Sequence, residues 1–400
     1  MHRGLQISLG VVVLLAIIGG AWYWSGRDWN QSAPDANNAA MPVPNATTTE
    51  FGLTLPGDFS ISILTSDVPG ARALVRDSFG NLWVSQTSEG MISTVELSQD
   101  EAVKRVQPVF RNMQKPHGIA LDPIHPLAFY IAEEDKISRV GLYSDGPVEK
   151  IADLPAGGRH TTRSLSFSPD GKLFVSVGSS CDVCHESDNR RAKILELDIE
   201  SGELSEFARG LRNAVFMAFH PKTGALWATE MGRDNLGDNL PPDEVNIIEK
   251  GKNYGWPICY GKNIHDSAFD KNTYIRNPCM EPLEVQSAID LQAHSAPLGL
   301  AFIPEEGWPA EYHHDLLVAY HGSWNRSEPT GYKIVRFRLD AEGRPEGGGA
   351  YEAEDFITGW LDERDEVNGR PVDILVESNG LIYITDDKGG RIYKVQHRSE

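Results

Sequence analysis

Two short segments place histidine, arginine and asparagine side chains just ahead of expected β-strands. The segment LPAGGRHTTRSLSFSPDG (154–171) carries His160 directly before an apolar strand. The segment FARGLRNAVFMAFHP (207–221) carries Arg212 and Asn213 at the corresponding place before the next strand. Histidine is the side chain most often used in general acid–base chemistry, so these groups are candidates for a common reactive site. A turn histidine bonded to backbone is the alternative interpretation of His160.

A third segment, EMGRDNLGDNLPPDEVNIIEKGKNYGWP (230–257), gathers carboxylates among glycines and prolines. Its acidic residues include Asp234, Asp238, Asp243 and Glu244. Ca²⁺ takes about six to eight oxygen ligands, which carboxylates and backbone carbonyls on an irregular loop can supply. The segment therefore predicts a calcium site, with a solvated acidic loop as the alternative.

The four cysteines fall into two groups. Cys259 and Cys279 lie in a loop-rich stretch and are expected to pair. The run Cys-Asp-Val-Cys-His (181–185) matches the pattern that attaches c-type haem. It stands between two expected strands, however, and no helical segment is available to hold a haem. We therefore expect a local disulfide or paired thiols here, and rank a zinc site below both.

The composition excludes several classes of protein. The 400 residues include 57 acidic and 37 basic side chains, which gives a formal charge of −20. This balance argues against a nucleic-acid partner, because binding to phosphates needs clustered Lys and Arg. A hydrophobic share of 40% excludes disorder for the bulk of the chain, and 38 Gly with 24 Pro argue against a helix bundle. The sequence has no strand–GxGxxG–helix unit, so NAD and FAD are not expected.

The N-terminus predicts export from the cytoplasm. Residues 5–24 carry no charge and end in three aromatic residues. Such a run can cross a hydrocarbon layer of about 30 Å, with its aromatic rings at the interface. We therefore expect residues 1–24 to be a signal anchor and the only contact with the inner membrane; a cleaved signal peptide is the alternative. Residues 25–50 are expected to be a flexible linker, and residues 51–400 a folded periplasmic domain.

From residue 73 onward, one two-strand pattern recurs six times. Each copy has an apolar strand, a turn, and a second strand of aliphatic and aromatic residues. The second strands end near Val84, Ile131, Val175, Ala228, Val318 and Ile384. A period of about 45 residues in the first copies, with paired strands, is typical of the four-stranded blades of a β-propeller. The repeat therefore predicts an all-β, six-bladed β-propeller rather than a β-sandwich.

Further segments complete the expected propeller. Residues 53–64 (LTLPGDFSISIL) are expected to add the outer strand that closes the last blade, which removes an open sheet edge. The stretches 231–295 and 304–312 exceed what a blade needs, and long loops in compact folds are usually functional. We expect both of them at the mouth of the central channel.

Five segments together are characteristic of one enzyme family: GGRHTTRSLSFSPDG, GLRNAVFMAFHP, DEVNIIEKGKNYGWP, AHSAPLGLAF and HGSWNRSEPTGYKIVRF. Through them, and over residues 51–397, the chain resembles the glucose/sorbosone dehydrogenases that depend on pyrroloquinoline quinone (PQQ), including the pyranose dehydrogenase branch. The resemblance implies a six-bladed propeller, in agreement with the repeat. It also implies an oxidoreductase that passes hydride from an aldose or pyranose sugar, or a sorbosone-like sugar aldehyde, to PQQ with Ca²⁺. A periplasmic cytochrome or quinone would accept the electrons.

The resemblance assigns catalytic roles. His160 matches the general base that acts on the anomeric hydroxyl of the sugar. Arg212 and Asn213 match the pair beside the quinone carbonyl, where negative charge develops. In the bacterial soluble glucose enzymes an acidic residue precedes this histidine and orients it, whereas Arg159 stands there in this chain. The base therefore needs another orienting group.

The resemblance also implies where Ca²⁺ and PQQ bind. The backbone carbonyls matching the loop that holds the Ca²⁺ next to the cofactor are those of Glu230, Met231, Gly232 and Arg233. The residues matching a second, structural Ca²⁺ site are Asp243, Glu244 and Tyr254. The residue matching a partner of the cofactor carboxylates is Arg370, and the further candidates for cofactor contact are Arg326 and Arg163.

Other residues and other functions stay open at this point. His294, His321, Trp256 and Trp324 are further candidates for contact with cofactor or substrate. A metal-dependent lactonase would use the same scaffold with an ion held by carboxylate and amide ligands on the channel axis. A non-catalytic propeller would keep the fold without the chemistry, and the basic Arg159 in place of an acid favours this alternative.

Overall fold

The computed structural model describes residues 40–144 and 146–398. The expected signal anchor (1–24) and the first part of the expected linker (25–39) lie outside these residues. Within the described ranges, no helix combines the length and apolar character needed to span a membrane. The helical elements described there are the short 3₁₀ turns η1 (Thr87–Glu89), η2 (Pro278–Met280) and η3 (Ala310–Tyr312).

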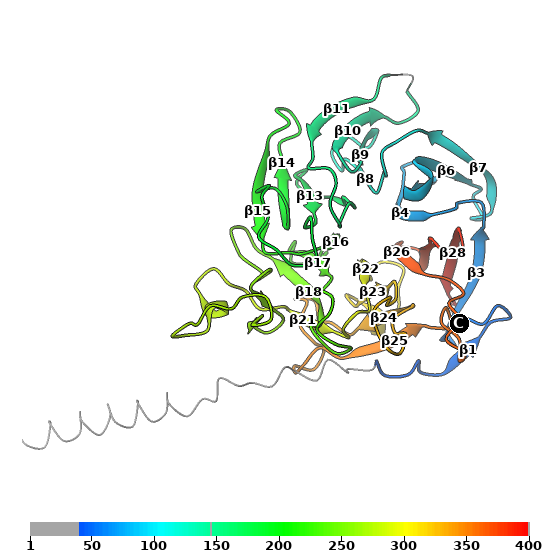
Figure 1. Cartoon of the computed structure of the whole chain (residues 1–400). Helices are drawn as coiled ribbons and strands as arrows, with labels where there is room; N and C mark the ends of the chain where they lie inside the picture. Colours follow the sequence, from blue (N-terminus) through cyan, green and yellow to red (C-terminus); the bar gives the residue numbers. More distant parts are fainter. Residues whose placement is uncertain (1–39, 145, 399–400) are drawn as a thin grey trace, which may run out of the picture. The chain divides into compact units, whose positions relative to one another are not determined.

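Six four-stranded antiparallel sheets stand around a central axis, each with its first strand nearest the axis (Figure 1). Blade 1 contains β4 (Ala71–Arg76), β5 (Leu82–Gln86), β6 (Met91–Leu97) and β7 (Val103–Phe110), and blade 2 contains β8 (Gly118–Leu121), β9 (Ala128–Ala132), β10 (Lys136–Gly141) and β11 (Glu149–Asp153). Blade 3 contains β12 (Leu165–Phe167), β13 (Leu173–Val177), β14 (Lys193–Leu197) and β15 (Leu204–Arg209).

The other three blades follow the same order. Blade 4 contains β16 (Ala214–Phe219), β17 (Leu226–Glu230), β18 (Asp243–Ile248) and β21 (Ile289–Leu291). Blade 5 contains β22 (Pro297–Phe302), β23 (Leu316–Tyr320), β24 (Lys333–Phe337) and β25 (Ala353–Ile357). Blade 6 contains β26 (Pro371–Val376), β27 (Leu381–Asp386), β28 (Arg391–His397) and β3 (Phe59–Thr65). The prediction of an all-β, six-bladed propeller is confirmed.

An N-terminal strand closes the ring, as the sequence predicts. β3 pairs antiparallel with β28, and Phe59 lies opposite His397. The residues just before it form a separate two-stranded sheet of β1 (Ala46–Thr48) and β2 (Thr54–Pro56). The expectation of a flexible linker up to residue 50 is therefore wrong for its last part, because backbone pairing to β2 orders β1.

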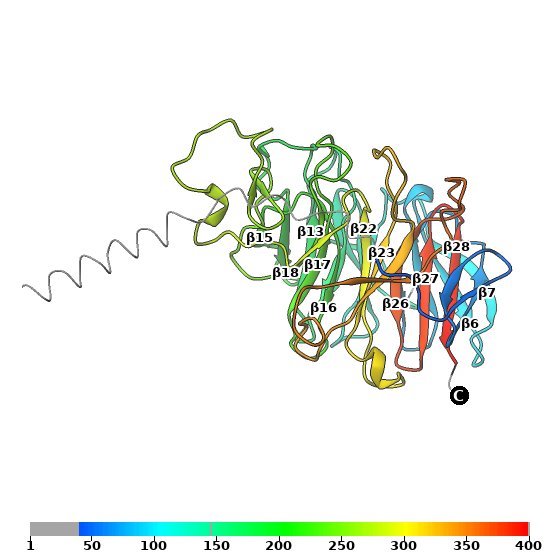
Figure 2. The ribbon, with the colours of Figure 1, turned by 90° about the horizontal axis from the view of Figure 1, so that it is seen from below.

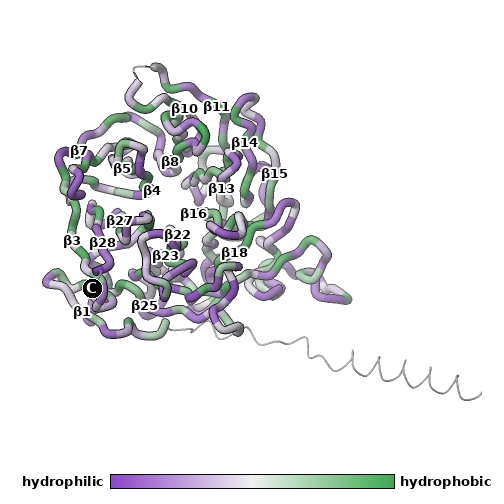
Figure 3. Tube along the Cα trace, turned by 180° about the vertical axis from the view of Figure 1, so that it is seen from behind, coloured by the Kyte–Doolittle hydropathy of each residue, from purple (hydrophilic) through white to green (hydrophobic). Residues whose placement is uncertain are grey.

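The second strands explain why the repeat is so apolar. Every residue of β5, β13, β17, β23 and β27 is buried, because a neighbouring blade covers each face of the sheet. Trp83 of β5, for example, packs against Phe129 of the next blade with ring centroids 5.1 Å apart. Full burial of one such ring stabilises the fold by roughly 1.5–3 kcal/mol. Figure 3 shows hydrophobic and hydrophilic residues alternating along many of the strands.

The two long stretches lie at opposite ends of the ring. Residues 249–288, between β18 and β21, form an insertion with β19 (Cys259–Tyr260) and β20 (Ile264–His265), and it projects beyond the blades (Figure 2). The stretch 304–312 was expected at the same mouth, but it joins the first and second strands of blade 5. Connections of that kind lie at the other end, where Trp308 Nε1 donates to the Glu377 carbonyl oxygen in the β26–β27 turn. The expectation for 304–312 is therefore wrong.

Candidate active site

A cavity of about 220 Å³ lies where the segments before β12, β16 and β22 meet the loop between β17 and β18. Its lining residues are Arg159, His160, Arg212, Asn213, Met231, Gly232, Asp234, Asp243, His294, Ala296, Trp324 and Asn325. The structure thus brings together the three residues for which the sequence predicts catalytic roles.

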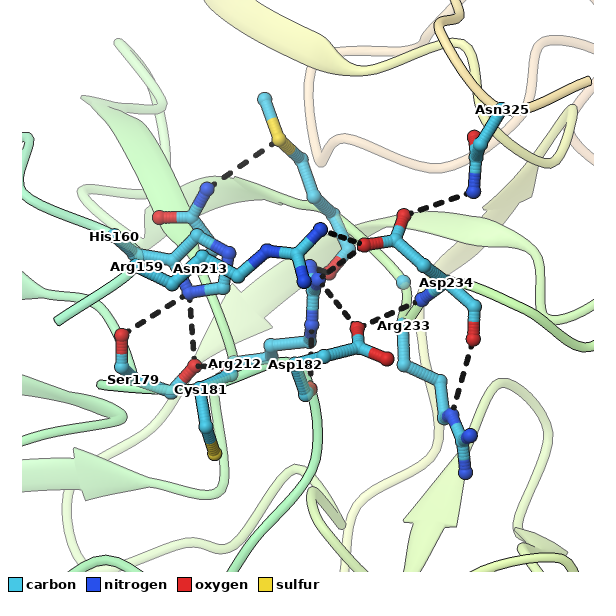
Figure 4. A network of polar contacts seen from close by, with 12 residues as sticks. Arg159, His160, Ser179, Cys181, Asp182, Arg212, Asn213, Arg233, Asp234 and Asn325 are labelled. Atoms are coloured by element: carbon cyan, nitrogen blue, oxygen red, sulfur yellow. Dashed lines mark hydrogen bonds and ion pairs between the residues drawn. The ribbon is translucent and has the colours of Figure 1, made fainter.

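Ser179 holds the imidazole of His160. Nδ1 of His160 lies 2.8 Å from Ser179 Oγ and 3.1 Å from the Ser179 carbonyl oxygen (Figure 4). Burial, and then the positive charges of Arg212 and Arg159, lower the pKa of His160 to about 3. The ring is therefore neutral near pH 7 and able to accept a proton. Ser179 thus supplies the orienting contact for which the sequence offered no candidate.

Gly178 allows His160 and Asn213 to approach one another. A Cβ atom on Gly178 would lie 2.6 Å from His160 Cβ and 2.8 Å from Asn213 Oδ1. Both distances are shorter than real Cβ contacts, so any other residue would push the two side chains apart. Gly178 and Ser179 follow β13 directly. The end of one buried strand therefore sets the spacing between the imidazole and the amide.

Arg212 is buried and its guanidinium is fixed by oxygen acceptors. Nε donates to the Asp182 carbonyl oxygen at 2.9 Å, and Nη1 donates to the Met231 carbonyl oxygen at 3.1 Å. Nη2 forms a salt bridge of 2.8 Å with Asp182 Oδ1. Three directions are thus set at once, so the plane of the guanidinium is determined by the protein itself.

Asp234 connects this guanidinium to a second one. Its Oδ2 lies 3.3 Å from Arg212 Nη2 and 2.5 Å from Arg159 Nη2, and its Oδ1 accepts from Asn325 Nδ2 at 2.9 Å. The Arg159 guanidinium also lies over the Trp324 ring, 5.7 Å from its centroid. Figure 4 shows this network, in which two arginines are balanced by Asp182 and Asp234.

A second cavity, of about 20 Å³, shares Arg212, Met231 and Gly232 with the first. Its wall includes Glu230 and Glu244, both buried. Glu230 Oε1 accepts from the Asn213 backbone N–H at 3.0 Å, whereas Oε2 has no hydrogen-bond partner. Burial and the Glu244 carboxylate raise the pKa of Glu230 well above its usual value, and burial raises the pKa of Glu244 to about 7. These carboxylates would be stabilised by a cation.

Two of the other expected calcium ligands, Asp243 and Tyr254, line different cavities. Asp243 lines the larger cavity, and its oxygens accept from the backbone N–H groups of Gly232 and Ala296 at 2.8 and 2.9 Å. Tyr254 lines the smaller cavity, but its hydroxyl donates to the Ile247 carbonyl oxygen at 2.6 Å.

Arg233 also lines the smaller cavity, where it pairs with Asp266 at 2.8 Å. The structure therefore gathers Glu230, Met231, Gly232 and Glu244 around a cation-compatible cavity. It leaves the Tyr254 hydroxyl engaged elsewhere.

Three arginines expected at the cofactor do not line the larger cavity. Arg163 is fully buried and donates to the carbonyl oxygens of Pro155, His160 and Thr162, so it anchors the His160 segment instead. Arg370 donates to the carbonyl oxygens of residues 321 and 322 at 3.2 and 3.1 Å. Arg326 donates to the carbonyl oxygen of residue 238. The resemblance had suggested Arg370 and Arg326, and the position before a strand had suggested Arg163. In the structure, backbone carbonyl oxygens accept hydrogen bonds from all three guanidinium groups.

The remaining candidates divide between the two cavities. His294 and Trp324 line the larger one, and Trp256 lines the smaller one. His321 lies apart from both and forms an ion pair with Asp387, with 2.9 Å between Nε2 and Oδ2. Gly178, Ser179 and Asp182 were missed. The only signal in the sequence is the small-residue run VGSS that leads from β13 into the first Cys-x-x-Cys residue.

Both cysteine pairs form disulfides. Cys181 is bonded to Cys184, and Cys259 to Cys279. The two expected pairings are confirmed. The Cys-x-x-Cys-His run is accordingly a closed turn whose thiols are not available for haem attachment.

Comparison with known proteins identifies the family. The TrAA12-like family model matches residues 53–398. An uncharacterized protein of Borreliella burgdorferi is 30% identical over 86% of this chain and 91% of its own length. The PQQ-dependent pyranose dehydrogenase of Coprinopsis cinerea is 23% identical over 90% of this chain, which spans 56% of that enzyme. The holo form of its PQQ domain superposes with a TM-score of 0.74 at 20% identity, over 89% of this chain and all of that domain. The chain belongs to the TrAA12-like family.

Proposed function

We propose that this protein is a dehydrogenase that removes a hydride from a C–OH group of an aldose or pyranose sugar and passes it to PQQ, with Ca²⁺ bound nearby. The observation that carries the proposal is the convergence of a neutral imidazole, a guanidinium and an amide on one cavity, from His160, Arg212 and Asn213. The Coprinopsis cinerea relative, which aligns with 90% of this chain, is described as PQQ-dependent. This likeness supports the same cofactor here.

The residues of the larger cavity fit a flat, anionic quinone. PQQ is a planar ring system with several carboxylates, so a site for it needs cationic donors and a face for stacking. Arg159 and Arg212 supply guanidinium groups, and Trp324 supplies an indole at the cavity wall. When bound, PQQ supplies an electrophilic quinone carbonyl that accepts the hydride.

The chain's own residues prepare the sugar for this step. His160 accepts the proton of the sugar hydroxyl, since its ring is neutral and Nδ1 is already bonded to Ser179. Arg212 and Asn213 present N–H donors where negative charge develops. The Asn213 amide is available for this, because its Nδ2 contacts only the Met231 sulfur, a weak acceptor, at 3.3 Å.

The smaller cavity fits Ca²⁺. Glu230 Oε2 is buried without a partner, and no Lys or Arg forms a salt bridge with Glu230 or Glu244 in the described part of the chain. A buried carboxylate in this state is costly unless a cation or proton compensates its charge. Hard oxygen donors of this kind suit Ca²⁺, which would hold the Glu230–Arg233 segment in place.

Reconstitution tests the proposal. The purified protein is incubated with PQQ, with Ca²⁺, or with both, and then offered a panel of aldoses and pyranoses with a redox dye. We expect dye reduction only when both are present, together with a shift in the PQQ absorbance on binding. A protein that neither perturbs PQQ nor oxidises any sugar under these conditions would refute the proposal. Lactone hydrolysis without PQQ would instead favour the lactonase alternative.

We further propose that the folded domain works in the periplasm, held by residues 1–24, and passes electrons to a cytochrome or a quinone. The uncharged run 5–24 and two disulfides support this location, because disulfides persist in oxidising compartments. A C-terminal fusion to alkaline phosphatase is expected to be active and to sediment with membranes. An inactive fusion would contradict the location, and an active but soluble one would contradict the anchor.

A further inference from the structure

The disulfide turn Cys181–Cys184 lies beside both His160 and Arg212, and the proposed function leaves it without a role. We propose that this turn, together with Ser179, is a positioning element that holds the His160 imidazole in one tautomer and the Arg212 guanidinium in one orientation. Its kinetic consequence rests on the proposed function, whereas its effect on the two side chains does not.

The contact to the imidazole runs through Ser179, which is fully buried. Its hydroxyl donates to the Cys181 carbonyl oxygen at 2.7 Å, so Oγ has no hydrogen left for His160 Nδ1 and can only accept from it, at 2.8 Å. The Ser179 carbonyl oxygen, 3.1 Å from the same nitrogen, can also only accept. Nδ1 must therefore carry the hydrogen of the neutral ring. Nε2 is left as the bare nitrogen that accepts a proton.

The contact to the guanidinium runs through Asp182. Its carbonyl oxygen accepts from Arg212 Nε at 2.9 Å, and its Oδ1 accepts from Nη2 at 2.8 Å. Two acceptors from one residue define both the position and the plane of the guanidinium. Oδ1 also accepts from the Asp234 backbone N–H at 2.8 Å, and the carbonyl oxygen also accepts from Trp256 Nε1 at 3.2 Å. Asp182 therefore ties the turn to the wall of both cavities.

The turn depends on its covalent link. Within the described ranges, residues 181–187 make no backbone–backbone hydrogen bond. Ser180, just before the turn, is held by Glu186, with contacts of 2.6 Å from N and 2.8 Å from Oγ. Between these points the bond from Cys181 to Cys184 closes the chain. The carbonyl oxygens of residues 181 and 182, one for each contact, lie inside that closed turn. Opening the disulfide would release both.

Nuclear magnetic resonance of the protein without PQQ or sugar tests the placement directly. Histidine is labelled with ¹⁵N, and the His160 signals are assigned by their loss in His160→Asn. We expect a one-bond N–H signal at Nδ1 and none at Nε2. In Ser179→Ala, and in Cys181→Ala/Cys184→Ala, we expect the Nδ1 hydrogen to exchange about fivefold faster, because a hydrogen bond of about 1 kcal/mol is lost or loosened.

A buried serine in another blade provides the matched control. Ser93, whose hydroxyl donates to Gln86, is buried in β6, and Ser93→Ala is expected to leave the His160 signals unchanged. Mild reduction of the folded wild-type protein covers the case in which the double cysteine variant fails to fold. A hydrogen found on Nε2 in the wild type would overturn the proposal. So would Nδ1 exchange that stays the same after Ser179→Ala and after reduction.

Kinetics then connect the placement to catalysis. Ser179→Ala is expected to lower kcat about tenfold with KM nearly unchanged, and Ser179→Thr, which keeps a hydroxyl, should restore most of the loss. Asp182→Ala should lower kcat without changing the His160 tautomer, because it acts on the other contact. A Ser179→Ala variant with wild-type kcat would contradict the kinetic part. Loss of all sugar oxidation in the wild type would instead contradict the proposed function, while the resonance result would still stand.

Discussion

The two cavities that share Arg212 differ in how Asp234 and Glu230 are partnered. In the larger one, Asp234 pairs with two guanidinium groups and Asp243 accepts two backbone hydrogen bonds. In the smaller one, Glu244 accepts from the Gly261 backbone N–H at 2.6 Å and from Asn246 Nδ2 at 2.9 Å, whereas Glu230 Oε2 has no hydrogen-bond partner among the described residues. Within the described residues, the larger cavity thus holds a carboxylate paired with two guanidinium groups, whereas the smaller one holds a buried carboxylate with one unpartnered oxygen.

This difference suits two kinds of chemistry. A general base must be neutral before it accepts a proton. Burial, together with the positive charges of the two arginines, lowers the pKa of His160 to about 3, so its imidazole is neutral near pH 7. A calcium site needs unpaired oxygens, and these would lower the affinity of the larger cavity for an anionic cofactor if they lay there. Residues of the Glu230–Arg233 segment lie between the two cavities, and Arg212 lines both.

The largest effect is expected from removing the base. His160→Asn should lower kcat by about a thousandfold, because general-base catalysis contributes roughly 10²- to 10⁴-fold. The affinity for PQQ, measured from its absorbance, should change little. Steady-state dye reduction gives the rate. A variant that retains more than a tenth of the wild-type kcat would show that the larger cavity does not work through this imidazole.

Gly178→Ala should follow, with a loss of kcat of about a hundredfold. The new Cβ would lie 2.6 Å from His160 Cβ and 2.8 Å from Asn213 Oδ1, so the two groups must separate. A displacement of this order in a reactive site costs about 10²-fold. Gly146→Ala is the control, since that glycine is exposed and has no positive φ, and a Cβ there meets within 4 Å only the flexible Ser144 hydroxyl. If the two variants had equal activities, the close approach of His160 and Asn213 that Gly178 allows would not be needed for the reaction.

Calcium removal should affect the smaller cavity and its pH dependence. Chelation is expected to lower the Tm by about 5 °C at pH 8. The pKa of Glu244, raised to about 7 in the folded protein, means that stability without Ca²⁺ is lost as pH rises from the unfolded value of about 4.3 through 7. Ca²⁺ should therefore raise the Tm more at pH 8 than at pH 5. In Glu244→Gln part of this pH dependence should disappear, because the raised pKa of Glu230 supplies another part, and an unchanged dependence would point to another ion site.

The smallest effect concerns the charge balance of the larger cavity. Because the pKa of His160 is about 3, kcat/KM should stay nearly flat down to about pH 5. Arg159→Gln removes a nearby positive charge, so the pKa of His160 should rise. The pH below which kcat/KM falls should then increase by roughly half a pH unit. Arg344→Gln, on an exposed arginine, is the control. If this pH is the same in Arg159→Gln as in the wild type, a group other than His160 determines the pH profile.

The propeller was predictable because its signal is local and repeated. Strand pairs such as the one ending at Val84 carry apolar residues in the pattern that two covering blades require. The closing strand was found within a few residues, at Phe59–Thr65. The stretch 304–312 was misplaced because the end at which a loop lies depends on which two strands it joins. To place such a loop from the sequence, one must know exactly how many strands precede it, and long connections between strands make that number hard to determine.

The site was predictable in its reactive groups and less so in the residues that hold them. His160, Arg212 and Asn213 stand at repeated positions of neighbouring blades, and the structure brings them to one cavity. Arg163 stands at a similar position, yet its guanidinium turns to three buried carbonyls. Position along the chain does not say which way a long side chain turns, because that depends on the acceptors that folding brings near it.

Periodicity and residue type along the chain were enough to indicate six blades and the Cys259–Cys279 pair, and the resemblance of short segments pointed to the candidate reactive groups. Packing between blades specified the rest. It set Ser179 against His160, left Glu230 Oε2 without a partner among the described residues, and placed Asp182 in contact with Arg212. These contacts join residues from separate turns of the chain, and their distances and burial arise only when the ring closes.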